Sequence, residues 1–378
     1  MKKYIFFLLC SFLFLNIVHA TQLTNYAKSA ILIEPTTKKI IYKLNENERL
    51  APASMTKIMT LLLIMESIDN GSISLNDEVL ISSNAANMGG SQVFLEANSK
   101  IKVEELIKSI AIASGNDAAV AMAEYIGGST QEFVNMMNNK VKELGLKNTN
   151  FVNVHGLDEN NHYSSAYDMA MIALELLKYP DILKYTSLYE DYLVKPDGSK
   201  TWLVNTNKLV RFYDGVDGLK TGYTGKAGYC LTSTAKKNNI RFLTVVMGED
   251  TSEHRSLDTT NMLNYAFANY KVNNIIAKDD VITNVKVLRG VKDNINVYVK
   301  EEVNDVVKHN EEKEYSYQKD INILKAPLKS GDVVGKLRVV DNNDILIKEV
   351  DLVVKDDINK NNFFTLFYDF FRSIVVGI

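Results

Sequence analysis

One apolar segment near the amino end of the chain restricts the fold more than any other feature. The stretch MTKIMTLLLIMESI, residues 55–68, is apolar on almost every side when drawn as a helix, which indicates a helix buried within a domain. Pro52, just ahead of it, favours a helix start there. Such a helix needs other layers around it. A chain of 378 residues, 46% of them hydrophobic, can supply these layers in two or three folded units.

The first twenty residues predict export. MKKYIFFLLCSFLFLNIVHA has two early lysines, an apolar run, and then Val18-His19-Ala20, the small-residue pattern after which signal peptidase cleaves. The alternative is a retained membrane anchor. The apolar run is, however, shorter than the roughly 20 residues that a bilayer-spanning helix needs.

Cleavage after Ala20 would leave a single thiol in the mature chain, because Cys10 departs with the signal and Cys230 stays. One cysteine excludes an internal disulfide framework, and Cys230, in a strand context, is expected to be a small buried hydrophobe. Removal of Lys2 and Lys3 takes the formal net charge from −3 to −5, which argues against nucleic acid as a partner. The histidines show no metal-ligand spacing, so no metal or other cofactor is expected.

Hydrophobic periodicity predicts a mixed domain followed by an all-β domain. Two strands, SAILIEP and KIIYKLN, come before the buried helix. Two helices within residues 102–128 are broken at SGND, and a later hairpin, AGYCLTST with IRFLTVVMG, precedes a final helix. We expect an α+β fold: a five-stranded, mainly antiparallel sheet with helices on both faces, plus a helical subregion over roughly residues 60–175. The expected units are a signal peptide at 1–20, the mixed domain at 21–275, the all-β domain at 276–355 and a terminal helix at 356–378.

The last stretch, NNFFTLFYDFFRSIVVGI, predicts an amphipathic helix. A polar stripe that includes Asp369 and Arg372 faces a surface of five phenylalanines and Ile374. Two charges make spanning a bilayer costly, whereas lying in the membrane interface suits this pattern. The alternative is a helix packed on its own β domain. The membrane is favoured because little else would cover so many phenylalanines at a chain end.

A serine and a lysine begin the buried helix, and their spacing suggests nucleophilic catalysis. Ser-x-x-Lys alone is weak evidence, because the chain contains it three more times. Only Ser54 and Lys57 stand at the start of a long apolar helix, where a three-residue step places both on one face near unpaired backbone N–H groups. Burial would lower the pKa of Lys57 and leave an amine that can take the serine proton. The alternative is a capping serine with a snorkelling lysine.

Two further short motifs have the same ambiguity when each is taken alone. Ser114 and Asn116 lie in the break between two apolar helices, where a turn can direct both side chains into a cleft. Lys220-Thr221-Gly222 precede the late hairpin and can form a neighbouring strand, in which a glycine permits close backbone approach. An ordinary turn is the alternative in both cases.

Taken in order, SMTK, SGN and KTG resemble the three signature motifs of the penicillin-binding proteins and serine β-lactamases. The longer strings APASMTKIMT, ASGNDAAVAMAE, HGLDENNHYSSAYDMA and DGLKTGYTGKAGYCLTSTA are similar to the D-alanyl-D-alanine carboxypeptidases, the low-molecular-mass penicillin-binding proteins. The resemblance covers residues 29 to about 270. A β domain and an amphipathic tail match the layout of the membrane-attached members.

The resemblance implies roles for individual residues. Ser54 would be the acylated nucleophile and Lys57 its general base, while Ser114 would relay a proton to the leaving group. Asn116 would bind the peptide backbone and position the Lys57 amine.

The strand residues would bind the substrate in this resemblance. Lys220 and Thr221 would contact the terminal carboxylate, and Gly222 would admit the ligand to the strand. The N–H groups of Ser54 and Tyr223 would form the oxyanion hole. Arg255 is a looser candidate as second carboxylate anchor.

The implied function is an exported serine carboxypeptidase that removes the terminal D-alanine from peptidoglycan stem pentapeptides and binds β-lactams. It would act at the outer face of the cytoplasmic membrane, or in a periplasm, attached through its tail. Three alternatives remain: a class A β-lactamase, a DD-endopeptidase and a non-catalytic wall-binding scaffold. The first is disfavoured because Gly115 occupies the place of its motif aspartate and no Glu-x-x-Leu-Asn loop is found.

Overall fold

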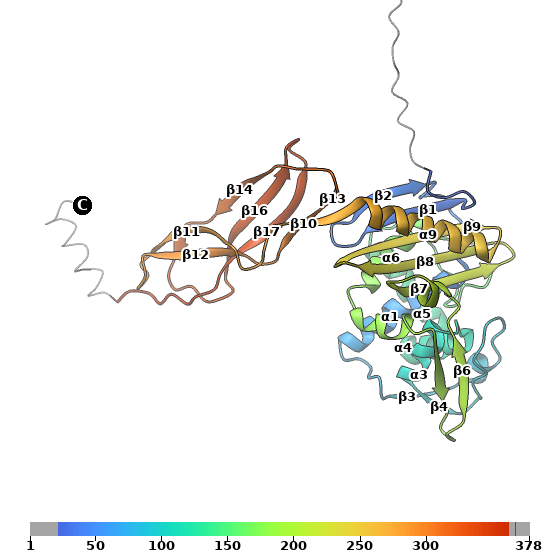
Figure 1. Cartoon of the computed structure of the whole chain (residues 1–378). Helices are drawn as coiled ribbons and strands as arrows, with labels where there is room; N and C mark the ends of the chain where they lie inside the picture. The colour runs from blue at the N-terminus through green and yellow to red at the C-terminus, as the bar shows by residue number, and fades with distance from the viewer. Residues whose placement is uncertain (1–21, 363–366, 368–378) are drawn as a thin grey trace, which may run out of the picture.

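The structure, a computed structural model, describes residues 22–362 and Phe367. The expected signal peptide and most of the expected terminal helix lie outside the described residues. Within the described part, the chain forms a mixed domain and an elongated β domain that extends from it like an arm (Figure 1).

The mixed domain is built on a five-stranded sheet in the order β2-β1-β9-β8-β7, and each pair of neighbours is antiparallel. The predicted sheet is therefore confirmed. Its strands are β1 (Ser29–Glu34), β2 (Lys39–Leu44), β7 (Val216–Thr224), β8 (Gly228–Lys237) and β9 (Ile240–Glu249). Because β7 has no neighbour on its outer side within this sheet, one edge is open to the helical part of the domain.

Helices cover both faces of this sheet, and β1 shows why. Its side chains alternate between two cores: Ile31 and Ile33 pack with the helical subregion, whereas Ala30 and Leu32 pack beneath α9 (Ser252–Asn269). A strand has a side-chain period of two, so a strand that is apolar at successive positions is buried on both faces. Figure 1 shows α9 lying across the strands on one side, with the helical subregion on the other.

The helix predicted over residues 55–68 is α1 (Lys57–Asp69), preceded by the 3₁₀ turn η1 (Ala53–Thr56). Its residues from Lys57 to Met65 are all buried, and its neighbours include α3, α4, α5 and α6. The helical subregion and its short strands comprise β3 (Glu78–Leu80), α2 (Ser83–Ala86), β4 (Lys100–Lys102), α3 (Val103–Ala111), α4 (Asn116–Gly127), α5 (Thr130–Glu143), α6 (Ala166–Leu176), η2 (Pro180–Ile182), α7 (Leu183–Thr186), β5 (Glu190–Val194), β6 (Lys200–Val204) and α8 (Leu209–Phe212).

The β domain begins where α9 ends. Strand β10 (Tyr270–Ile276) follows without a break and pairs with β13 (Val303–Lys308). A six-stranded sheet in the order β14-β16-β17-β12-β11-β15 completes the domain. Its strands are β11 (Val281–Leu288), β12 (Asn294–Val299), β14 (Tyr315–Ile321), β15 (Leu324–Lys325), β16 (Val333–Asp341) and β17 (Leu346–Val354). The all-β character expected for this region is confirmed.

The two domains contact each other at the base of the arm. Lys39 Nζ donates a hydrogen bond to the Val306 carbonyl, and His309 N donates to the Asn269 carbonyl at 2.8 Å. Val306 also belongs to the core beneath α9. Polar and apolar contacts therefore join β13 to the mixed domain.

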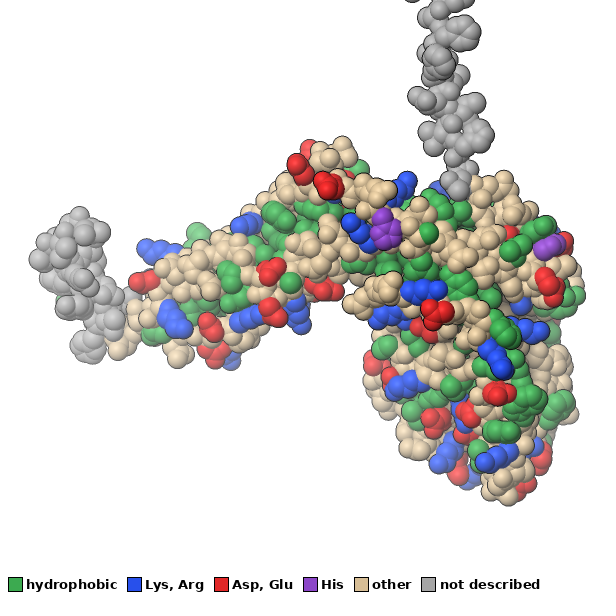
Figure 2. Space-filling model, in the orientation of Figure 1, with side chains coloured by type: hydrophobic (Ala, Val, Ile, Leu, Met, Phe, Trp, Pro, Cys, Tyr) green, Lys and Arg blue, Asp and Glu red, His purple; other side chains and the backbone are tan. Residues whose placement is uncertain are grey.

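At the other end of the arm, the described chain runs along the β domain as far as residue 362. Ile358 bridges Leu328, and Lys360 bridges Gly290. Residues 356–362, expected to begin the terminal helix, are therefore not helical and join the β domain by isolated bridges. In the described part of the chain, no helix has the length and apolarity to cross a membrane. On the face drawn in Figure 2, acidic and basic side chains are interspersed over both domains.

Candidate active site

The turn that carries Ser54 lies between the edge strand β7 and the start of α1. Its neighbours Ala53, Met55 and Thr56 are buried, whereas Ser54 itself is partly exposed. The local sequence therefore fixes the turn through its apolar residues and leaves one hydroxyl accessible at its surface.

Lys57 lies at the bottom of the site and is 0% exposed. Its Nζ atom is 3.1 Å from Ser54 Oγ, 2.6 Å from Asn116 Oδ1 and 2.8 Å from the His155 carbonyl. Burial, and next the charge of Lys220, hold the pKa of Lys57 well below its ordinary value, while Asp117 opposes them. An amine held in this way can accept the proton of the neighbouring hydroxyl.

The SGN motif forms the opposite wall. Ser114 has φ of +64° and is 3% exposed, so the backbone makes a tight left-handed turn just before α4. Asn116, the first residue of α4, donates through Nδ2 to the Gly89 carbonyl at 2.6 Å and through its backbone N to the Ser91 carbonyl at 2.7 Å. These bonds leave Oδ1 for Lys57, and they attach the loop that contains residues 89–91 to this wall.

The third motif lies on β7. Lys220 is 1% exposed, and its Nζ donates to the Thr221 carbonyl at 3.1 Å. Thr221 Oγ1 donates to Thr206 Oγ1 at 2.7 Å, and Thr206 also lies 3.5 Å from Lys220 Nζ. Burial, with a further contribution from Arg255, lowers the pKa of Lys220 to about 7. An arriving anion would favour the charged ammonium at this position.

Gly222 allows β7 to approach the turn that carries Ser54. A Cβ atom at this position would lie 2.8 Å from the Pro52 carbonyl oxygen and 3.0 Å from Ala53 Cβ. A residue with a side chain would push the strand and the turn apart, so the close approach requires glycine.

Tyr223 and Arg255 lie beyond this contact. Tyr223 is 57% exposed, and its ring packs against that of Tyr229 at a tilt of 32°, with centroids 4.3 Å apart. Arg255, near the start of α9, is 8% exposed and places its guanidinium 5.9 Å from the centre of the Tyr229 ring. Among the described residues, its buried Nε has no hydrogen-bond partner. The charge of Arg255 is, after burial, the second cause that lowers the pKa of Lys220.

The site contains contacts that sequence reasoning missed. The His155 carbonyl, the Gly89 carbonyl and the Thr206 hydroxyl all contact motif residues, yet none belongs to a motif. Backbone carbonyls have no side-chain signature, and a lone threonine is too common to single out. His155, in the string HGL, contacts Lys57 through its backbone carbonyl and not through its imidazole.

Two further buried polar side chains near this region, His162 and Asp168, have local partners. His162 Nε2 is 2.8 Å from Thr56 Oγ1, and its Nδ1 accepts a hydrogen bond from Val152 N. Asp168 accepts hydrogen bonds from Asn148 N and the Thr149 hydroxyl. Over residues 22–362, no cluster of three or more His, Cys, Asp or Glu side chains is suited to hold a metal ion.

Cys230 is fully buried on β8, and burial raises the pKa of its thiol to about 11. A thiol in this environment remains protonated and unreactive. The structure therefore agrees with the sequence interpretation of this residue as a small buried hydrophobe.

Comparison with known proteins identifies two families along the chain. Residues 16–251 match the D-alanyl-D-alanine carboxypeptidase family, and residues 270–360 match the C-terminal domain family of penicillin-binding protein 5. The chain is 49% identical over 348 residues to the D-alanyl-D-alanine carboxypeptidase DacF of Bacillus subtilis, covering 91% of this chain and 89% of that protein. It is 34% identical over 358 residues to DacA of Escherichia coli, covering 92% and 87%.

Solved structures agree with these matches. Penicillin-binding protein 5 of Haemophilus influenzae superposes with a TM-score of 0.74 at 32% identity, covering 89% of this chain and 98% of that one. A structure titled as a peptidoglycan synthesis regulatory factor, PBP3 of Streptococcus pneumoniae, gives 0.78 at 29% identity, covering 89% and 100%. The likeness extends over both domains.

The buried imidazole of His162 predicts a pH-dependent stability. Burial lowers its pKa from 6.5 to about 4, so below pH 6.5 the unfolded chain binds a proton that the folded chain refuses. The contribution of His162 to the free energy of unfolding is therefore fully present above pH 6.5, the pKa of this imidazole in the unfolded chain. It is lost as the pH falls toward 4, at about 1.4 kcal/mol per pH unit.

Urea unfolding at a series of pH values measures this effect. Below pH 6.5, the free energy of unfolding should fall less steeply with decreasing pH for His162→Gln than for the wild type. Replacement of the exposed His309 by Gln serves as control, and equal slopes for His162→Gln and the wild type would contradict the prediction.

Proposed function

Because the chain belongs to the D-alanyl-D-alanine carboxypeptidase family and is a serine D-Ala-D-Ala carboxypeptidase, we propose that Ser54 is the nucleophile and carries the acyl group in the acyl-enzyme. The observation that carries the proposal is the contact between Ser54 Oγ and the buried Lys57 amine, 3.1 Å long, at the open edge of the sheet. The substrate is the peptidoglycan stem pentapeptide, whose last peptide bond joins two D-alanines.

Acylation proceeds by proton transfer and attack. Lys57 Nζ takes the Ser54 proton as Oγ attacks the carbonyl carbon of the D-Ala-D-Ala bond. The N–H groups of Ser54 and Tyr223 stabilise the resulting oxyanion, and such donors are typically worth about 3 kcal/mol each in the transition state. The carbon–nitrogen bond then breaks. Ser114 relays the proton that Lys57 took from Ser54 to the departing nitrogen, so Lys57 is again a neutral amine and free D-alanine leaves.

Deacylation uses the same groups in the reverse sense. Water attacks the ester carbonyl, gives up a proton to Lys57, and the bond to Ser54 Oγ breaks with return of a proton to the serine. A β-lactam follows the first half of this path. Its ring amide opens on Ser54 and leaves an acyl-enzyme that water attacks slowly.

Cations and hydroxyls at one end of the cleft suit the terminal carboxylate. We assign Lys220 and Thr221 to this anion, with Arg255 as a second cation at the same end. The tight approach of Gly222 to the turn of Ser54 supports placing the peptide along β7. Asn116, held by Gly89, both contacts Lys57 and offers an amide to the peptide backbone.

The alternatives weighed from the sequence are not favoured. The curated relatives named above are carboxypeptidases, and the motif position that a class A β-lactamase fills with aspartate is Gly115. A non-catalytic scaffold would have no need to hold Lys57, Ser54 and Asn116 within hydrogen-bond distance.

Replacement of Ser54 tests the assignment. Ser54→Ala removes the oxygen that would carry the acyl group, so penicillin labelling and D-alanine release should both disappear. Mass spectrometry of tryptic peptides after penicillin treatment of the wild type should place the adduct on the peptide that contains Ser54. Ser316→Ala is a matched control, because Ser316 begins another Ser-x-x-Lys in the β domain and should label normally. Retained labelling of Ser54→Ala would refute the assignment.

We also propose that the chain is exported and attached to the outer face of the cytoplasmic membrane through its C-terminal segment. The signal-like residues 1–20 and the amphipathic pattern of the tail support this. The mature chain should sediment with vesicles containing anionic lipid, whereas a variant ending at Asn362 should stay in the supernatant. Equal recovery of both variants in the supernatant would argue against attachment.

A further inference from the structure

A buried carboxylate next to the site has no part in the mechanism above. Asp117, in the first turn of α4, is 0% exposed. Its oxygens accept hydrogen bonds from Val93 N, at 3.0 and 3.2 Å, and from Leu95 N, at 3.2 Å. Oδ1 also accepts from Ala118 N at 2.9 Å. The carboxylate therefore fastens the loop of residues 87–95 to the start of α4.

The same loop sets the orientation of Asn116. The Ser91 carbonyl accepts from Asn116 N, and the Gly89 carbonyl accepts from Asn116 Nδ2. Gly90, with φ of +80°, lies so close that a Cβ atom there would be 2.6 Å from Nδ2. The loop thus fixes which end of the amide faces Lys57.

Asp117 also acts on Lys57 through its charge. Burial and Lys220 lower the pKa of Lys57, whereas Asp117 raises it. His155 is the other titratable group at this amine, and burial together with Lys57 lowers its pKa to about 4, so it stays neutral near neutral pH. Asp117 is thus the anionic member of the group that surrounds Lys57.

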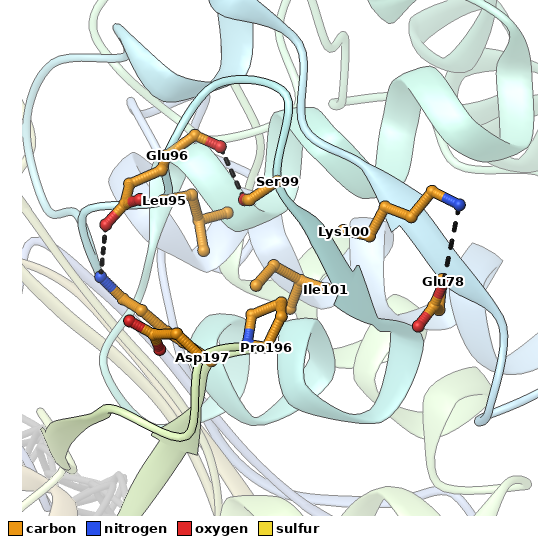
Figure 3. Close-up of a pocket in the computed structure, with 9 residues that line it drawn as sticks. Glu78, Leu95, Glu96, Ser99, Lys100, Ile101, Pro196 and Asp197 are labelled. Atoms are coloured by element: carbon orange, nitrogen blue, oxygen red, sulfur yellow. Dashed lines mark hydrogen bonds and ion pairs between the residues drawn. The ribbon is translucent and has the colours of Figure 1, made fainter.

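The outer side of the loop is attached separately. Leu95, Glu96, Ile101 and Pro196 are among the residues that line a cavity of about 400 Å³. Figure 3 shows these side chains. Lys195 forms an ion pair with Glu96 at 3.3 Å. This attachment joins the loop to the turn after β5, and it does not involve Asn116 or Lys57.

We propose that Asp117 is a positioning residue for the acylation step, acting on Lys57 in two ways. Its hydrogen bonds hold the loop that orients the Asn116 amide, and its carboxylate places a buried negative charge next to the residue that contacts the Lys57 amine. The proposal rests on the roles proposed above for Ser54 and Lys57. It adds that a residue outside substrate contact sets the strength of the base.

Asp117→Asn tests both parts, because the amide has the same shape without the charge. The measurement is the rate of acylation by a fluorescent penicillin as a function of pH. The plateau of this profile, where the rate no longer rises with pH, should be about tenfold lower than in the wild type, as expected for a lost buried hydrogen bond. The acid limb of the profile, where the rate falls because Lys57 becomes protonated, should move to lower pH by up to about one unit, because loss of a nearby anion lowers the pKa of Lys57. A residue with a merely structural role would lower the plateau and leave the limb in place.

Two variants separate the effects. Gly90→Ala displaces the Asn116 amide and keeps the carboxylate, so its plateau should fall with no movement of the limb to lower pH. Glu96→Gln removes only the outer ion pair, so both plateau and limb should match the wild type.

An acid limb of Asp117→Asn that coincides with the wild type, or moves to higher pH, would overturn the proposal. Should Asp117→Asn not fold, Asp117→Ser keeps a small acceptor in its place. Failure of both variants to fold would assign the carboxylate to folding alone and would also overturn the proposal. If instead the proposed function were wrong, the wild type itself would carry no adduct on Ser54.

Discussion

The confinement of one amine, that of Lys57, is the interaction on which the rest of the site depends. The side chain starts a helix that is buried from Lys57 to Met65 and has no exposed surface itself, so the charged form loses its hydration. Lys220 adds a second cation to the same pocket and disfavours that form further. What remains is an amine with an acceptor on two sides and a serine hydroxyl on the third. The helix, the edge strand and the SGN turn all serve to keep it there.

Much of this arrangement could be predicted from the sequence. The all-round apolar character of residues 55–68 required a central helix, and α1 occupies that place among the helices around it. The break at SGND separated α3 from α4, and the late hairpin gave β8 and β9. Period-two burial of β1 on both faces explains why helices had to cover both sides of the sheet.

Other contacts of the site could not be predicted from the sequence, for physical reasons. Lys57 contacts a carbonyl of residue 155, and Asn116 contacts a carbonyl of residue 89; any residue type can supply such atoms. Thr206 reaches Thr221 only because β6 ends beside β7, which no local pattern specifies. The loop around Gly90 is attached to α4 by Asp117, which accepts hydrogen bonds from the Val93 and Leu95 backbone N–H groups, and such donors likewise leave no signature in the sequence.

The site lies in the mixed domain, and the β domain extends from this domain as a separate arm. In the described part of the chain, the bonds of the motif residues given above all lie within the mixed domain, and the β domain contacts that domain at β2 and at the end of α9. The described chain ends at the far end of this arm (Figure 1), so a tail bound to a membrane would hold the cleft away from the bilayer. A substrate that is part of a wall layer above the membrane fits such a position.

The most direct test of the account is the protonation state of Lys57 itself. Nitrogen NMR of the Lys57 Nζ atom, assigned by comparison with a Lys57→Arg variant and followed through a pH titration of the unacylated protein, reports whether this atom is an amine or an ammonium. The account predicts a neutral amine near neutral pH and protonation only on acidification. An ammonium that persists into the alkaline range, with the ordinary behaviour of an exposed lysine, would contradict it.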